Sequence, residues 1–100
     1  MESKYYILLS LKNTIGYECF GQYFLGDDKD HATGIFSELK GKPDISEQAM
    51  LHMDFVETLN GLPARIKTIC CTLDEFTCNC KFIAKEIFRL NSLKELISVI

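Results

Sequence analysis

Aromatic and β-branched residues gather in four short stretches of the chain, each bounded by turn-forming residues, and this pattern predicts four β-strands. The first stretch is too short for a stable helix, and the later ones alternate between apolar and polar positions. A helix over Met50–Phe55 is the alternative for the third stretch, but its weak apolar stripe and the Asn60–Gly61 turn signal favour a strand. The four predicted strands are Tyr5–Leu11, Tyr17–Leu25, Ala49–Glu57 and Ala64–Cys71. The first is apolar on both faces, as expected for a strand in the centre of a sheet.

Strict alternation assigns the side chains of the second and fourth strands to faces. In the second strand Tyr17, Cys19, Tyr23 and Leu25 would share one face, and Glu18, Phe20, Gln22 and Phe24 the other. In the fourth strand Arg65 and Lys67 would face water, while Ile66, Thr68 and Cys70 would face inward.

Two helices are predicted from apolar residues that recur at offsets of three and four. The first begins at a cap formed by Asp27 or Asp28, ends before Gly41 and Pro43, and has an apolar stripe of Ala32, Ile35, Phe36 and Leu39. The second opens at Thr72, which stands three residues before Glu75, the spacing of a capping box. Its stripe consists of Phe76, Cys80, Ile83, Ala84 and Ile87.

The second helix is expected to end near Leu90, because Asn91 and Ser92 can cap a further turn with Glu95. Beyond this point the apolar residues Leu93, Leu96, Ile97, Val99 and Ile100 form a C-terminal tail. We expect the tail to pack on the sheet or to meet a partner, of which a second copy of the chain is the commonest kind.

The order of elements is strand, strand, helix, repeated twice, with Gly16 and Gly61 in corresponding turns 45 positions apart. This ββαββα pseudo-repeat predicts an α+β fold, a four-stranded antiparallel sheet with two helices packed on one face. The first and third strands are the more apolar and are expected in the centre. Pro63, Arg65 and Lys67 suit an edge strand. A linear meander is the alternative strand order.

Length and composition indicate one domain spanning residues 1–100, with 47% hydrophobic and 25% charged residues. A net charge of −3 without a basic patch argues against a nucleic-acid partner, and no apolar run is long enough for a membrane span. The beginning of the chain lacks the basic and small-residue features of a secretory signal. With five cysteines, an odd number, we expect a cytoplasmic protein whose thiols are reduced.

Cysteine is the one residue type that clusters near a predicted helix start. Cys71 directly precedes the Thr72 cap, where the helix dipole can lower a thiol pKa. A reactive thiol at Cys71, acting with Cys70 or Cys78, is therefore one hypothesis, and burial of these residues as small apolar side chains is the other. The cysteine spacing does not match a zinc site, so no metal or cofactor is predicted.

His52 and Asp54 occupy alternate positions of the third strand and are predicted to share the sheet face away from the helices. The default interpretation of His52, and of His31 near the first helix start, is a solvated surface residue. No phosphate-binding loop, nucleophile elbow or zinc-protease motif is present in the sequence, and no catalytic residue is predicted.

The sequence favours a small soluble, non-enzymatic association or binding domain that self-associates as a homodimer. Its alternative is a thiol-based redox or metal-sensing module that uses Cys71 with Cys70 or Cys78. Binding of a small ligand on the sheet face around His52 and Asp54 is a third possibility, which the sequence does not separate from a dimer interface. None of these functions follows from the ββαββα order alone.

Overall fold

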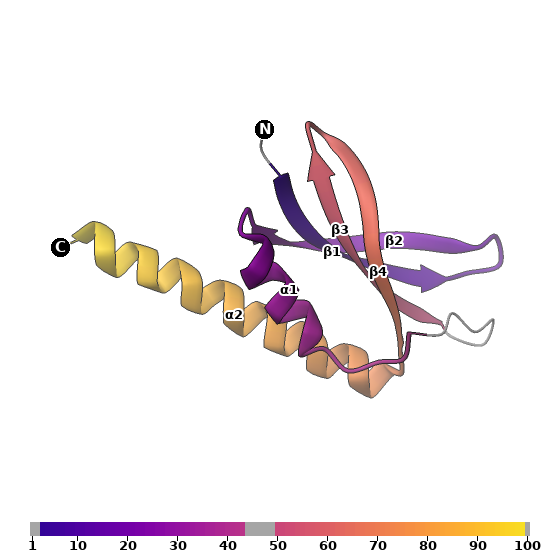
Figure 1. Ribbon diagram of the computed structural model, residues 1–100. Coiled ribbons are helices and arrows are strands. Elements are labelled where there is room, and N and C mark those ends of the chain that lie inside the picture. Colours follow the sequence, from indigo (N-terminus) through magenta and orange to yellow (C-terminus); the bar gives the residue numbers. More distant parts are fainter. Residues whose placement is uncertain (1–2, 44–49, 100) are drawn as a thin grey trace.

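The computed structural model describes residues 3–43 and 50–99, with side chains through residue 90. Four strands form one antiparallel sheet, and both helices lie against the same face of it (Figure 1). The elements follow the predicted ββαββα order: β1 Ser3–Lys12, β2 Tyr17–Gly26, α1 Lys29–Ser37, β3 Leu51–Leu59, β4 Leu62–Cys71 and α2 Leu73–Val99. The predicted α+β fold is therefore confirmed. The connector at Asp44–Gln48 lies outside the described residues.

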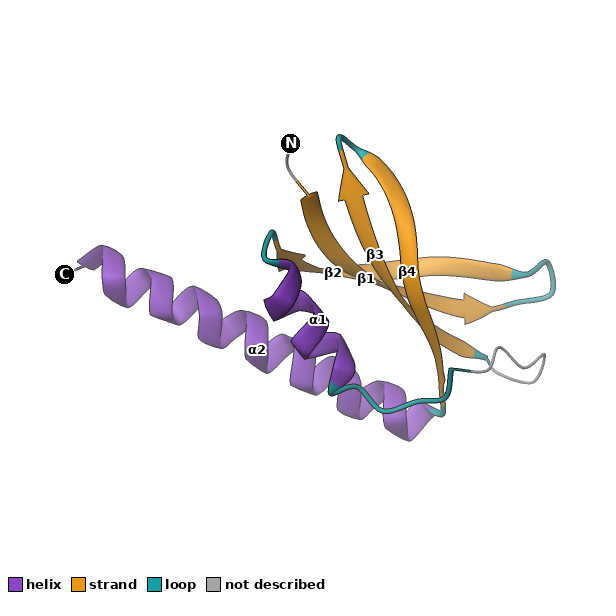
Figure 2. Cartoon of the chain, viewed as in Figure 1, coloured by secondary structure: helices purple, strands orange, loops and turns teal. Residues whose placement is uncertain are grey.

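The strand order is β2-β1-β3-β4, with the two most apolar strands in the centre as predicted. The β1–β2 and β3–β4 hairpins are joined by antiparallel pairing of β1 with β3, in which Ile7 lies opposite Phe55. β1 and β3 pair with a strand on both sides, whereas β2 and β4 are the edge strands. The edge of β4 is partly covered by Lys42, whose backbone forms an antiparallel bridge with Cys70. The strands cross at steep angles in Figure 2, so the sheet is strongly twisted.

Bulges overturn the face assignments that alternation predicts for β2 and β4. The β1–β2 register shifts between Leu9 and Ser10, so that Phe20 is an extra residue on β2, and the β3–β4 register shifts at Ile66 in the same way. Each extra residue moves the following side chains to the opposite face.

As a result, Tyr17 and Cys19 share a face with Gln22 and Phe24, while Phe20 points to the helices and contacts Phe76 at 5.9 Å between ring centroids. In β4 the buried core residues are Ile69 and Cys71, and Thr68 and Cys70 lie on the other face. Ile66, predicted to face inward, is 47% exposed.

The helix starts are capped as predicted. At α1 the Asp28 carboxylate accepts hydrogen bonds from the backbone N–H groups of Asp30 and His31. At α2 the backbone N–H of Thr72 donates to Glu75 Oε1 at 2.9 Å, and the N–H of Glu75 donates to Thr72 Oγ1 at 3.1 Å. This reciprocal pair is a complete capping box and satisfies two N–H groups that the helix itself leaves unpaired.

Helix α2 differs from prediction in its length and its buried face. It continues without a break through Asn91 and Ser92 to Val99, 27 residues in all, so the predicted end near Leu90 is wrong. Ala84, predicted within the buried stripe, is exposed, and Asn79 is buried instead at 2% exposure. None of the described helices has both the length and the apolar content that a membrane span requires.

The hydrophobic core lies between the sheet and the helices. Ile7 and Met53 on the central strands and Ile83 on α2 are fully buried, and the rings of Phe36 and Phe55 stack with centroids 5.1 Å apart. The remaining core residues are Tyr5, Leu9, Leu25, Ala32, Ile35, Ile69 and Cys71. The other face of the sheet is left without a helix over it (Figure 1).

Candidate functional site

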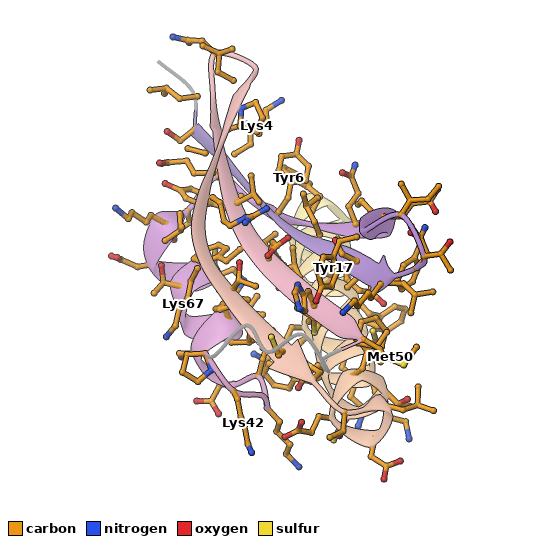
Figure 3. All side chains as sticks on the ribbon, turned by 90° about the vertical axis from the view of Figure 1, so that its right-hand side faces the viewer. Lys4, Tyr6, Tyr17, Lys42, Met50 and Lys67 are labelled. Atoms are coloured by element: carbon orange, nitrogen blue, oxygen red, sulfur yellow. The ribbon has the colours of Figure 1, made fainter. Side chains whose placement is uncertain are left out.

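His52 and Asp54 lie where the sequence places them, on the sheet face away from the helices, which we call the open face. Figure 3 looks onto this face and shows Lys4, Tyr6 and Tyr17 on it. The cross-strand pairs place His52 opposite Ser10 and Asp54 opposite Leu8. His52 is only 5% exposed and Asp54 only 6%, so the expected solvated position of His52 is wrong.

Asp54 is held by two partners from β4. Thr68 donates its hydroxyl to Asp54 Oδ1, and Arg65 Nε lies 3.7 Å from the same oxygen. The arginine side chain is 64% exposed while the aspartate is almost covered, so the guanidinium lies toward solvent. A buried carboxylate needs such compensation because desolvation disfavours its charged form. The bulge at Ile66 puts Arg65 in this position.

His52 is covered by Tyr17 from the β1–β2 hairpin. The two rings stack with centroids 4.0 Å apart, and His52 Nε2 is buried without a hydrogen-bond partner among the described residues. Burial lowers the pKa of His52, opposed by the negative charge of Asp54 and assisted by the positive charges of Arg65 and Lys12. No hydrogen bond joins His52 to Asp54 in the described part of the chain.

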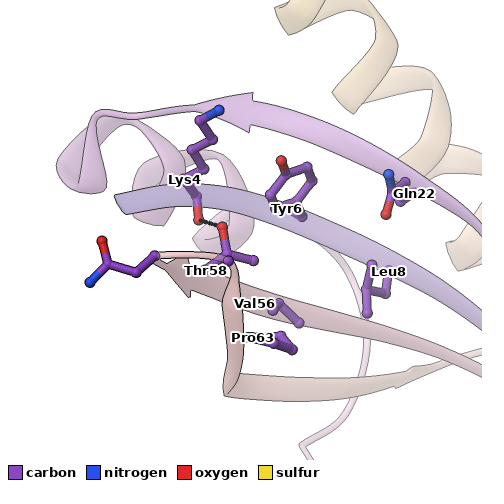
Figure 4. Close-up of a pocket in the computed structure, with 9 residues that line it drawn as sticks. Lys4, Tyr6, Leu8, Gln22, Val56, Thr58 and Pro63 are labelled. Carbon is purple, nitrogen blue, oxygen red and sulfur yellow. Dashed lines mark hydrogen bonds between the residues drawn. The ribbon is translucent and has the colours of Figure 1, made fainter. Parts of the chain in front are cut away.

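A groove of about 610 Å³ lies beside this cluster on the open face (Figure 4). Its apolar floor comes from β1, β3 and β4, and polar side chains stand around it. The nine lining residues are Lys4, Tyr6, Leu8, Gln22, Val56, Thr58, Asn60, Gly61 and Pro63. Thr58 Oγ1 donates to the backbone carbonyl of Lys4 at 3.5 Å, which joins the two central strands at the groove. Its volume falls within the range of small-molecule sites, roughly 300–1,000 Å³.

Cys71, the predicted reactive thiol, lies in the core. Its side chain is 7% exposed, Sγ lies 3.4 Å from the Lys40 carbonyl oxygen, and Asn79 Nδ2 lies 3.6 Å from Sγ. Burial raises the pKa of Cys71 to about 11, and the charge of Glu75 acts in the same direction. Burial therefore outweighs the effect of the helix dipole on the pKa of Cys71, and these surroundings oppose thiolate formation.

Cys70 and Cys78, the proposed partners of Cys71, differ from it in the face that they occupy or in their exposure. Cys70 points to the open face opposite His52, and Cys78 is exposed on α2. All five cysteines are free. Within the described ranges, 3–43 and 50–99, no group of three or more His, Cys, Asp or Glu side chains is arranged to hold a metal ion. Reactivity of Cys71 with Cys70 or Cys78 stays a prediction.

Two features of the site were not predicted from the sequence. The first is the stacking of Tyr17 on His52, which depends on the bulge in β2. The second is the position of three cations, Lys4, Lys12 and Arg65, on the open face. Lys4 and Lys12 have the even numbering offset along β1 that signals one shared face, but the face of Arg65 depends on the second bulge.

Comparison of the chain with protein-family models, with curated proteins and with solved structures finds no match. The geometry of the open face and the course of α2 are therefore the observations from which a function is argued.

Proposed function

We propose that this protein is a small, non-enzymatic association domain that forms a homodimer through the distal segment of α2, residues 88–99. The observation that carries the proposal is the course of α2, which extends past α1 and away from the sheet (Figure 1). Its 27 residues correspond to about 40 Å at 1.5 Å per residue. The end of the helix lies beyond the sheet (Figure 1).

A helical segment that leaves the body of a protein needs a packing partner. Isolated short helices are marginal in water because nucleation is costly, and most helix stability in proteins comes from burial of an apolar face. Phe88, at the beginning of the distal segment, is 74% exposed. Beyond it the sequence contains Leu90, Leu93, Leu96, Ile97 and Val99. A second copy of the chain supplies the same segment, so that pairing of the two segments covers the apolar residues of each.

The open face is the less suitable surface for a twofold interface. It carries Lys4 and Arg65, and Asp54, the acid among the described strand residues of this face, is already paired with Arg65. Two such faces stacked about 10 Å apart would bring like charges together, which disfavours association. This charge distribution supports a dimer through α2 that leaves both open faces accessible.

Light scattering after size exclusion tests the proposal. The expected mass at micromolar concentration is twice the monomer mass of 11.4 kDa. The double substitution Leu93→Glu and Ile97→Glu should give a monomer, because each introduced charge would be desolvated in the interface. The charge-matched control Asn91→Glu and Ser98→Glu changes polar positions of the same segment and should remain dimeric. A wild-type monomer of 11.4 kDa would refute the proposal.

We place the protein in the cytoplasm. The five free thiols, two of them adjacent at Cys70 and Cys71, support this proposal, because disulfides do not persist in a reducing compartment. Acid quenching of the intact source cells, followed by alkylation of the thiols in denaturant, would test the location. Complete alkylation of the five cysteines is expected, and a protein recovered with disulfides would contradict it.

A further inference from the structure

We propose that the groove on the open face binds a small amphiphilic anion, a carboxylate with an apolar chain, with its acid group at Lys4 and its chain on the groove floor. This inference is independent of self-association through α2. The groove belongs to β1, β2 and the β3–β4 hairpin, on the sheet face that the helices leave uncovered (Figure 4).

The floor of the groove is suited to an apolar body. Tyr6, Leu8, Val56 and Pro63 contribute carbon surface from three neighbouring strands. The Tyr6 ring packs on Phe24, with centroids 5.2 Å apart and planes inclined by 44°, and Phe24 is 50% exposed. Aromatic and aliphatic surface left in a concave site supplies binding free energy when a ligand displaces water from it.

The polar groups around the groove select the sign of the ligand's charge. None of its nine lining residues is acidic, and Lys4 forms no ion pair in the described part of the chain. The Tyr6 hydroxyl also has no hydrogen-bond partner among the described residues. Gln22 and Asn60 contribute side-chain amides at the rim. An ammonium group with a nearby phenol and amides is a donor set suited to a carboxylate.

The neighbouring charges reinforce this preference. Arg65 lies on β4 opposite Val56 of the groove floor, and its side chain is 64% exposed. Among the described strand residues on this face, the acid is Asp54, which Arg65 and Thr68 already engage. A face with net positive charge on a chain of net charge −3 therefore attracts an anion locally.

Dodecanoate is the probe for the test, titrated into the full-length protein by calorimetry. We expect one molecule bound per chain with a Kd below about 1 mM. Dodecyltrimethylammonium, which has the same chain and the opposite charge, should bind at least about fivefold more weakly, the factor for roughly 1 kcal/mol of screened electrostatic discrimination. Equal binding of the two amphiphiles would overturn the proposal, because it would show apolar adsorption alone.

Two matched pairs of variants locate the site. Lys4→Glu should weaken dodecanoate binding at least about fivefold, whereas Lys67→Glu, an exposed cation opposite Phe55, should change it by less than about twofold. Tyr6→Ser should weaken binding, and Phe88→Ser should not. Thermal melts monitored by circular dichroism identify any variant that fails to fold. If a variant fails to fold, the site is located instead by nuclear magnetic resonance on the wild-type protein, in which dodecanoate should shift the amide signals of β1.

Three results contradict the site. They are equal effects of Lys4→Glu and Lys67→Glu, amide shifts confined to α2, and absence of binding below about 1 mM. A short single-stranded RNA that binds the same residues more tightly than dodecanoate would also overturn the proposal, because the open face would then be a stacking surface for bases. Loss of dimerisation in the α2 variants, with dodecanoate binding unchanged, separates the two proposals.

Discussion

Asn79 joins α2 to the segment that follows α1, and its replacement by alanine is a direct test of how the helices are held on the sheet. The Asn79 side chain is 2% exposed. Its Oδ1 accepts from the Lys40 N–H at 2.8 Å, and its Nδ2 donates to the Lys40 carbonyl at 2.7 Å. One side chain thus satisfies both backbone groups of a residue 39 positions away.

The expected cost follows from these two bonds. Each net hydrogen bond contributes about 1 kcal/mol, so Asn79→Ala should lower the free energy of unfolding by about 2 kcal/mol. For a domain of this size that corresponds to a decrease in Tm of roughly 8–16 °C. Asn79→Asp keeps the acceptor for the Lys40 N–H but loses the donor and buries a charge. It should destabilise the protein at least as much.

Urea unfolding followed by far-ultraviolet circular dichroism measures the change, at equal protein concentration because dimerisation adds to stability. Cys78→Ala is the matched control, since Cys78 is the exposed neighbour on the same helix, and it should stay within about 0.5 kcal/mol of wild type. If Asn79→Ala also falls within about 0.5 kcal/mol, the two bonds to Lys40 do not hold the helix, and the reasoning is wrong.

Three further predictions use the same kinds of measurement. Ile83→Lys should leave the chain unfolded, because Ile83 is 0% exposed, whereas the exposed neighbour Ala84→Lys should fold; a folded Ile83→Lys would contradict this packing. With a pKa of about 11, Cys71 should be only about one-thousandth thiolate at pH 8, so an aromatic disulfide reagent followed by peptide mass spectrometry should label Cys78 promptly and Cys71 only in denaturant. Burial lowers the pKa of His52, so the unfolded chain takes up its proton first and the free energy of unfolding should decrease as pH falls from about 7 to 5.5; an undiminished decrease in His52→Gln would contradict this assignment.

Most of the architecture follows from the apolar pattern and the caps. β1 and β3, the more apolar strands, lie in the centre of the sheet as their pattern predicts, and the Thr72–Glu75 spacing marks the start of α2. These features depend on residues that are close in sequence, where composition and spacing carry the physical information. The placement of His52 and Asp54 on one face follows from the same local rule.

The wrong predictions arise where one extra residue or a contact distant in sequence determines which side chains are buried. Bulges at Phe20 and Ile66 reverse the faces of the residues that follow them. A bulge is defined by pairing with the neighbouring strand, so alternation within one strand does not reveal it. Asn79 is buried because Lys40 lies across from it, a contact that helical periodicity does not reveal. The cap signal at Asn91 and Ser92 does not end α2, which continues to Val99.

The same limitation applies to the candidate site. The sequence near Cys71 indicates an exposed helix start, but the backbone of Gly41 lies so close to this thiol that a methyl group at Gly41 would be only 3.2 Å from Cys71 Sγ. Burial then raises the pKa of Cys71 although the sequence places it beside a helix N-terminus. Conversely, the groove at Lys4 and Tyr6 becomes visible only when β1 lies beside the β3–β4 hairpin.

An isotope-filtered nuclear Overhauser experiment on a mixture of labelled and unlabelled chains tests the central claim, self-association through the distal segment of α2. Contacts between chains are expected among the methyl groups of Leu93 and Ile97 and the ring of Phe88. Rotational correlation times should correspond to twice 11.4 kDa. A correlation time of a single chain, or contacts between chains confined to the open face, would contradict the proposed homodimer.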